Sequence, residues 1–292
     1  MYDRFERFHP LILFIYYSGA IILFFLLLHP LFLSIAFFLV LLLHLLYDRG
    51  RSLRQWLFFM VTTGIFLFLL NPLFNERGRH VLFSIFQHRF TLEAFIYGGM
   101  SAFSVMSVIA LFVSYNEIMK PNKLLFLFAK LLPQFAVLLM LTLRFIPLMK
   151  KRAEDITAIQ KSKGITAANG PLSKRMETGM LFLQALLVFS LEEAIQTADS
   201  MKARGYGLRK RSSYEYFVFK KSDWIAGLFL VFLFIAIAYG RENGYGYLTV
   251  YPHLENWYLT GMDWEILLFE CLYLSFPLMV NVGRRIRWRI LR

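Results

Sequence analysis

Long apolar runs dominate the chain and recur between short polar stretches. A helix needs about 20 predominantly apolar residues to cross the hydrocarbon core of a bilayer. Five runs approach that length, and a sixth is interrupted by glycines and serines. The five are Leu11–Leu28, Leu31–Leu46, Trp56–Leu70, Trp224–Tyr239 and Ile266–Val282, and the sixth is Phe95–Val113. The pattern predicts an all-α, polytopic membrane protein with about six transmembrane helices.

Basic residues gather in the polar stretches and predict the orientation of the spans. Lys and Arg favour the cytoplasmic side of a bilayer, whereas Arg241–Asp263 holds one basic residue among tyrosines and glycines. Placing every basic cluster in the cytoplasm requires an even number of spans, so we expect both termini to be cytoplasmic. Leu11–Leu28 is expected to be retained, because it is long for a signal peptide and no small-residue cleavage site follows it. The clusters are Arg49, Arg51 and Arg54; Lys120 and Lys123; Lys150, Lys151, Arg152, Lys161, Lys163, Lys174 and Arg175; Lys202, Arg204, Arg209, Lys210, Arg211, Lys220 and Lys221; and Arg284, Arg285, Arg287, Arg289 and Arg292.

The middle of the chain is apolar but is not expected to cross the membrane simply. Leu124–Met149 lies between basic clusters and contains Pro133 and Pro147, which are expected to break it. It should lie along the membrane face or be buried among other helices. Met180–Phe189 is too short to cross, and apolar residues recur at helical spacing after it. The predicted organisation is four transmembrane helices in 1–123, amphipathic cytoplasmic coupling helices in 124–222, and transmembrane helices with a basic tail in 223–292.

Two predicted helices in this middle region end in the same way. Ala153–Lys161 is followed by Ser162, Lys163 and Gly164, and Leu191–Lys202 is followed by Ala203, Arg204 and Gly205. A basic residue before glycine suits a helix C-terminus, because the cation meets the negative end of the helix dipole and glycine adopts the left-handed conformation. One such triplet is more often an ordinary helix cap. Two in one amphipathic region indicate a pair of tips that contact a partner.

Three motifs stand in order along the chain. The first is Asn71-Pro72-Leu73-Phe74-Asn75-Glu76-Arg77-Gly78, followed by Thr91-Leu92-Glu93-Ala94; the second is Arg144-Phe145-Ile146-Pro147-Leu148, which leads into Ser162-Lys163-Gly164; the third runs from Ala198 to Tyr206 and contains Ala203-Arg204-Gly205. In this combination the chain resembles the transmembrane coupling (T) component of energy-coupling factor transporters, the CbiQ-like proteins.

The resemblance implies a scaffold without enzymatic activity or cofactor, in a bacterial or archaeal cell membrane. In such transporters two cytoplasmic ATPase subunits each receive one helix tip in a surface groove, and a separate small S-type membrane subunit captures a vitamin, a metal ion or another substrate. By position, Lys163 would be the first tip and Arg204 the second. The family usually has arginine at both, and lysine keeps the charge but loses the planar two-point contact.

Composition and motif content weigh against other functions. Hydrophobic residues make up 58% of the chain and the net charge is +13, but the basic residues lie between apolar runs, which argues against nucleic-acid binding. The histidines lack the spacing of a metal site, and Cys271 is the lone cysteine. No phosphate-binding loop is present, so another chain must hydrolyse ATP. The alternative function is a self-contained permease or channel, which would place polar residues at mid-membrane; an intramembrane lipid enzyme would need an acidic or histidine cluster.

Two carboxylates, Glu265 and Glu270, flank or enter the last apolar run. An intramembrane carboxylate is a functional candidate by default. The simpler interpretation, which we favour, places Glu265 at the interface and gives Glu270 a hydrogen-bond partner on a neighbouring helix.

Overall fold

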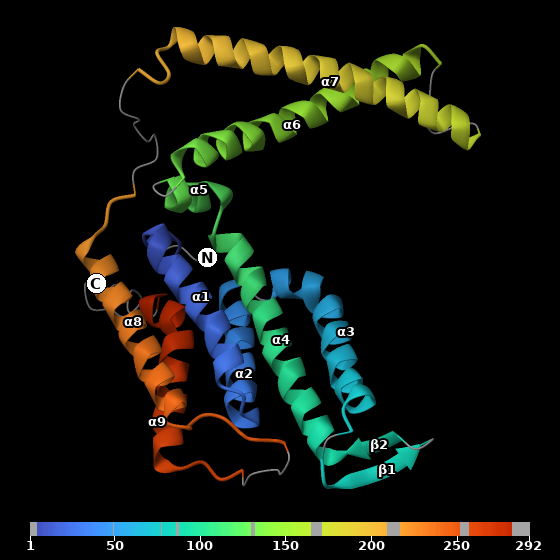
Figure 1. The fold of residues 1–292 in the computed structure, drawn as a ribbon. Coiled ribbons are helices and arrows are strands. Elements are labelled where there is room, and N and C mark those ends of the chain that lie inside the picture. The colour runs from blue at the N-terminus through green and yellow to red at the C-terminus, as the bar shows by residue number, and fades with distance from the viewer. Residues whose placement is uncertain are drawn as a thin grey trace. The chain divides into compact units, whose positions relative to one another are not determined.

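The structure is a computed structural model that describes residues 5–48, 50–76, 78–85, 88–129, 132–164, 171–208, 217–251 and 257–281 (Figure 1). The chain forms two compact units, Met1–Lys123 with Phe217–Arg292 (unit 1) and Leu124–Tyr216 (unit 2). Several residues of the sequence predictions lie outside the described residues: Arg49, Arg77, Lys130, Arg209, Lys210, Arg211, His253 and the basic tail from Arg284 to Arg292.

Unit 1 contains most of the helices and one β-hairpin. Its elements are a 3-10 turn (Phe5–Arg7), α1 (Pro10–Leu26), α2 (Pro30–Asp48), α3 (Arg51–Phe74), β1 (Val81–Ile85), β2 (His88–Thr91), α4 (Leu92–Ile118), α8 (Lys221–Glu242) and α9 (Gly261–Leu274). The short helix α5 (Pro121–Ala129) begins in unit 1, and unit 2 contains α6 (Pro133–Ser162) and α7 (Leu172–Ala203).

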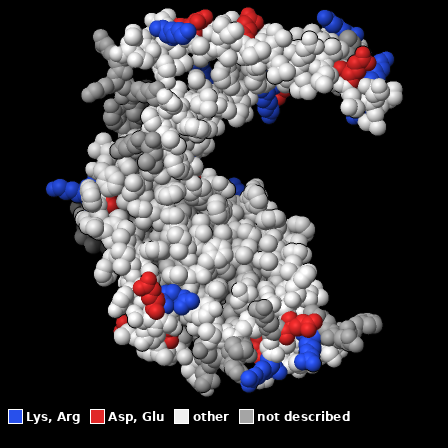
Figure 2. Space-filling view, viewed as in Figure 1, with Lys and Arg blue, Asp and Glu red and all other residues white. Residues whose placement is uncertain are grey.

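The prediction of an all-α polytopic membrane protein is confirmed. Five described helices, α3, α4, α6, α7 and α8, are long and apolar enough to cross a membrane, and α1 and α2 are shorter apolar helices. Figure 2 shows a broad band without charged side chains across the middle of unit 1, whereas both acidic and basic residues are distributed along unit 2. Length and composition alone therefore do not separate α6 and α7 from transmembrane helices, but their charge distribution differs from that of unit 1.

Hydrogen bonds between helices organise the core of unit 1. Tyr16 on α1 donates its hydroxyl to the Leu274 carbonyl at 3.0 Å, and Tyr273 on α9 donates to the Ile15 carbonyl at 2.9 Å. The Tyr273 hydroxyl occupies the space where a side chain at Gly19 would lie. A small residue at the contact lets two apolar helices approach closely, and buried hydroxyls then have backbone carbonyls within reach. The result is a close contact between the first and last described helices.

Two predictions about local structure are wrong. Pro147 does not break the apolar segment, because α6 continues through it to Ser162; a proline removes one N–H, and a 30-residue helix retains its hydrogen bonds on both sides. The run Ile266–Val282 is not one helix, since α9 ends at Leu274 and helical residues resume at 276–281 around Pro277. Between α3 and α4 the chain forms the hairpin β1–β2.

Burial of His29 makes the stability of unit 1 depend on pH. His29 lies between α1 and α2, is 5% exposed, and its Nδ1 accepts a hydrogen bond from the Leu31 N–H at 3.3 Å. Burial lowers the pKa of His29 from 6.5, and the charge of Asp263 opposes this only in part. At a pH between the lowered pKa of folded His29 and the value of 6.5 in the unfolded chain, the unfolded chain binds more protons than the folded chain. The folded state is therefore most stable above pH 6.5, and it loses stability as the pH falls below that value.

We therefore expect a lower melting temperature at pH 5.0 than at pH 7.5, measured by thermal denaturation in detergent. His29→Asn keeps a side-chain acceptor for the Leu31 N–H without titrating. This variant should show a smaller difference between the two pH values, and an unchanged difference would assign the effect to other groups.

Candidate docking site

The tip of α6 is an exposed helix C-terminus closed by glycine. Lys163 is the capping residue, and Gly164 follows with φ +76°. The Gly164 N–H donates to the Lys161 carbonyl at 3.0 Å, and Ser162 Oγ donates to the Ile159 carbonyl at 2.7 Å. Both Lys163 and Gly164 are exposed. The carbonyls at this helix end thus accept hydrogen bonds from neighbouring residues of the chain. The Lys163 side chain remains available to solvent.

The tip of α7 repeats this arrangement more completely. Arg204 is the capping residue and Gly205 has φ +78°. The Gly205 N–H donates to the Lys202 carbonyl at 2.9 Å, and the Tyr206 N–H donates to the Met201 carbonyl at 3.0 Å. This pair of bonds defines the Schellman motif, in which a left-handed glycine reverses the chain after the last turn. Arg204 is exposed, as is Ala203 before it.

Helices α6 and α7 cross, and their tips lie at opposite ends of the crossed pair (Figure 1). The guanidinium of Arg152 on α6 lies 5.5 Å from the centre of the Phe189 ring on α7, which places the contact within each helix rather than at its end. With a rise of 1.5 Å per residue, Lys163 lies about 16 Å beyond this contact along α6, and Arg204 lies about 22 Å beyond it along α7. The structure therefore separates the two tips instead of joining them in one site.

Both crossed helices expose large apolar side chains. Ile146 and Phe135 on α6 are 59% and 60% exposed, and Met176 and Leu187 on α7 are 73% and 62% exposed. Soluble surfaces rarely carry contiguous apolar patches of this kind unless a partner or a membrane covers them. The other strongly exposed apolar residues of the pair are Leu138, Leu139, Met140, Ile159, Leu172, Met180, Leu181, Leu183, Val188, Leu191 and Ile195.

The remaining motif residues fall into two places. Arg144 and Pro147 lie on α6, where both are exposed. Asn71 and Pro72 lie in the last turns of α3, and the Asn75 N–H caps that helix by donating to the Asn71 carbonyl at 2.9 Å. Gly78 follows with φ +154°, close to the start of α4. The residues of the first motif thus lie at the corner where α3 ends and α4 begins.

A buried carboxylate holds this corner together, and the sequence motif that contains Glu93 does not reveal this role. Glu93 is 0% exposed and accepts hydrogen bonds from the Arg79 N–H at 3.1 Å, the His80 N–H at 3.1 Å and His80 Nδ1 at 2.9 Å. A Cβ at Gly78 would lie 2.6 Å from Glu93 Oε2, so only glycine leaves room for the carboxylate. Thr91 caps α4 by accepting from the Ala94 N–H, and a threonine before an apolar run was the one available signal.

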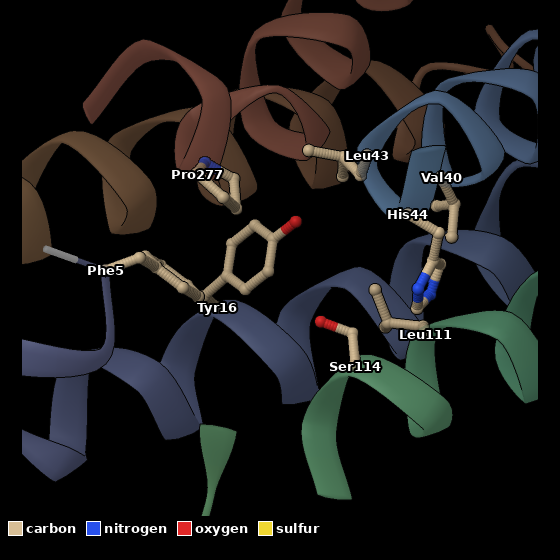
Figure 3. A pocket seen from close by; sticks show the side chains of 8 residues that line it. All are labelled: Phe5, Tyr16, Val40, Leu43, His44, Leu111, Ser114 and Pro277. Carbon is tan, nitrogen blue, oxygen red and sulfur yellow. The ribbon is translucent and has the colours of Figure 1, made fainter. Parts of the chain in front are cut away.

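A small cavity in the core of unit 1 is too small for a solute. It lies between α1, α2 and α4, where Tyr16, His44 and Ser114 face it (Figure 3). Its volume is about 10 Å³, which is close to that of one water molecule. His44 Nε2 lies 2.8 Å from the Ala110 carbonyl and must donate to it. This cavity itself is therefore not a pathway for a substrate.

Among the described residues, the histidines form no metal cluster and Glu270 lacks the hydrogen-bond partner that we expected. No group of three or more His, Cys, Asp and Glu residues in those ranges could hold a metal ion. Glu265 is exposed, whereas Glu270 is 1% exposed and neither of its oxygens has a hydrogen-bond partner in the described part of the chain. The partner expected for Glu270 on a neighbouring helix is thus not found there.

Comparison with known proteins points to one family. The chain is 27% identical over 205 residues to the energy-coupling factor transporter transmembrane protein of Acidaminococcus fermentans, which covers 70% of this chain and 69% of that protein. It is 25% identical over 195 residues to the protein of the same name from Staphylococcus aureus (61% and 72% covered), and 30% identical over 94 residues to that of Lacticaseibacillus paracasei (32% and 36% covered).

The match to a family model extends over most of the chain. Residues 6–214 match the model of the CbiQ family, described as cobalt transport protein, and this range includes α1 to α7 and both helix tips. The resemblance inferred from the three sequence motifs is confirmed by this match. The chain is thus a transport-related, multi-pass membrane protein that belongs to the CbiQ family.

Proposed function

We propose that this chain is the coupling subunit of an energy-coupling factor importer. In this role it links two cytoplasmic ATPase subunits to a separate membrane subunit that captures a vitamin, a metal ion or a similar substrate. Arg204 and Lys163 are the points where the ATPases dock, one at each tip. The chain hydrolyses no ATP itself.

The observation that carries this proposal is the pair of matched tips on crossed helices. Each tip offers one exposed cation beside a glycine-closed helix end. A cation at this place lies next to backbone carbonyls, so an acidic or carbonyl-lined groove on a partner can accept both the side chain and the helix end. Because the tips lie at opposite ends of the α6–α7 pair, two separate partners can dock at the same time (Figure 1).

The exposed apolar side chains of α6 and α7 support a membrane partner for the same unit. Their exposure leaves a large surface that a second apolar protein surface can cover. Displacement of the tips by the ATPases then moves this covered surface, and the captured substrate is released through that movement. With the basic clusters in the cytoplasm, unit 2 and both termini lie on the cytoplasmic side of the cell membrane.

Reversing the charge at both tips tests the docking role. We expect Lys163→Glu with Arg204→Glu to abolish co-purification of the ATPase subunits from detergent, because an anion at each tip repels a groove that binds a cation. The measurement is the amount of ATPase recovered per tagged transmembrane chain. Arg204→Ala alone should reduce it more than Lys163→Ala, since guanidinium makes two-point contacts that an ammonium cannot.

The matched control is Lys150→Glu with Lys151→Glu, which makes the same change in net charge at exposed positions of α6. With a rise of 1.5 Å per residue, these positions lie about 18 Å from the Lys163 tip. This control should keep the ATPases bound. Equal recovery from the tip variant and the native chain, with both proteins monodisperse, would exclude the tips as docking points.

A further inference from the structure

Unit 2 is joined to unit 1 at two junctions in the sequence. The chain leaves unit 1 after Lys123 and returns to it at Phe217. In the described residues of unit 1, both junctions contact one short segment near the N-terminus. We call this segment, residues Phe5 to His9, the N-terminal clasp.

The outgoing junction is fixed by a buried lysine. Lys123 is 8% exposed, and its Nζ donates to the Glu6 carbonyl at 2.8 Å and to the Ile118 carbonyl at 3.0 Å. An ammonium group is seldom buried unless its protons are accepted, and here backbone carbonyls of the clasp and of α4 accept them. A second lysine, Lys120, forms a more exposed ion pair with the Glu6 carboxylate at 3.0 Å. Exposed pairs of this kind contribute little, so Lys123 makes the main contact.

The returning junction packs on the other end of the same segment. The His9 ring lies 4.3 Å from the Phe219 ring and 6.4 Å from the Phe217 ring, measured between centroids. Phe219 also contacts Trp224 in the first turn of α8, at 5.5 Å. His9 itself is held in place, because its Nδ1 accepts from the Leu11 N–H at 3.2 Å and so caps α1.

The clasp is anchored in the core of unit 1. Phe5 is fully buried, and its ring lies 5.3 Å from Tyr16, 6.2 Å from Tyr17 and 6.0 Å from Phe276. Edge-to-face aromatic contacts at these distances are favourable. A segment fixed by Phe5 and touching both junctions ties the two junctions to one point of the transmembrane bundle.

We propose that the N-terminal clasp holds together the two segments of unit 1 that lead into and out of unit 2, with Lys123, His9 and Phe219 as positioning residues. This inference rests on the proposed coupling function. In that function a displacement of α6 and α7 passes through the two junctions, so the junctions must be held in place. Lys123→Met leaves two carbonyls without their donor, and Phe219→Ala removes the ring that packs on His9. Loss of both contacts frees the junctions from the clasp while the helices of unit 1 keep their own packing.

Spin labels across the junctions test this inference on the isolated chain in lipid nanodiscs. In a Cys271→Ser background, labels at Asn122→Cys and Val218→Cys report the distance between the junctions. We expect a narrow distance distribution in the native sequence. In the Lys123→Met, Phe219→Ala variant, the width should at least double. A second label pair within the bundle, Ile22→Cys and Leu228→Cys, should keep its width, which separates release of the junctions from general loosening.

The control variant Lys120→Met with Phe232→Ala removes the same residue types at exposed positions. Its junction distance should stay narrow. An unchanged width in Lys123→Met, Phe219→Ala overturns the inference. If that variant does not fold, Phe219→Ala alone decides, because an unchanged width there also overturns it. These labels need no ATPase, whereas failure of the proposed function is seen in the co-purification of the tip variants, so the two failures are distinguishable.

Discussion

Glu93→Ala is expected to destabilise unit 1 by about 1–3 kcal/mol, because alanine removes a buried carboxylate that accepts several hydrogen bonds. Glu93 accepts two backbone N–H bonds, from Arg79 and His80, and one from the His80 ring. Alanine removes the shared acceptor of those N–H groups, and water can replace it only in part because Arg79 and His80 are exposed whereas the Glu93 side chain is buried. It also removes a negative charge from the first turn of α4, where the helix dipole favours an anion.

Thermal denaturation in detergent measures the loss of stability, and two further variants show whether the hydrogen bonds of Glu93 cause it. Glu93→Gln keeps one acceptor oxygen and should lose less stability than Glu93→Ala. Glu265→Ala removes an exposed carboxylate from the first turns of α9 and should change the melting temperature little. If Glu93→Ala and Glu265→Ala melted alike, the hydrogen bonds around Glu93 would not stabilise the corner between α3 and α4.

Gly98→Ala is expected to destabilise unit 1 by about 1–3 kcal/mol, the usual range for overpacking. A Cβ at this position on α4 would lie 2.8 Å from the Phe68 carbonyl oxygen and 3.1 Å from the Asn71 Cβ on α3. The nearest atom belongs to a helix backbone, so it cannot move aside as the end of a flexible side chain can. The two helices must separate, and α3 packs mainly on α4.

The adjacent glycine provides the control. At Gly99 an added Cβ meets the Phe68 ring only at ordinary contact distances of 3.9–4.0 Å. Replacing glycine by alanine within a helix otherwise favours the helix by about 1 kcal/mol. Gly99→Ala should therefore melt at the native temperature or above it. Equal melting of the two variants would mean that close approach of α3 to α4 is not required at Gly98.

The apolar helices and the helix tips could be located from the sequence, because both are determined by residues close together along the chain. An apolar run marks the part of a helix that meets lipid, and a basic residue before glycine marks its C-terminus. The left-handed conformation predicted for Gly164 and Gly205 is found, with φ of +76° and +78°. Helix ends were less well placed: α3 begins at Arg51, before the apolar run at Trp56, because polar residues continue a helix that apolar content cannot detect.

Features that depend on contacts between distant segments could not be predicted. His80 and Glu93 meet because a hairpin brings residues 13 positions apart together, and the hairpin sequence contains no glycine turn signal. The sequence predicts Lys123 to be part of a cytoplasmic basic cluster. In the structure its ammonium group is buried against the Glu6 carbonyl, 117 positions away. Predictions about docking at Lys163 and Arg204 stay predictions until partners are tested.

The hairpin β1–β2 also determines how deep this corner lies in the bilayer. Within the described residues the sheet has two strands, so each strand has one edge that pairs with no further strand. Such an edge is not tolerated in lipid hydrocarbon, and the hairpin must lie at headgroup level or beyond. Helix α4, which begins directly after it, has 27 residues and is about 40 Å long, whereas the hydrocarbon core is about 30 Å thick. The excess length falls at the opposite end, where the polar residues Asn116, Glu117 and Lys120 favour projection into the headgroups.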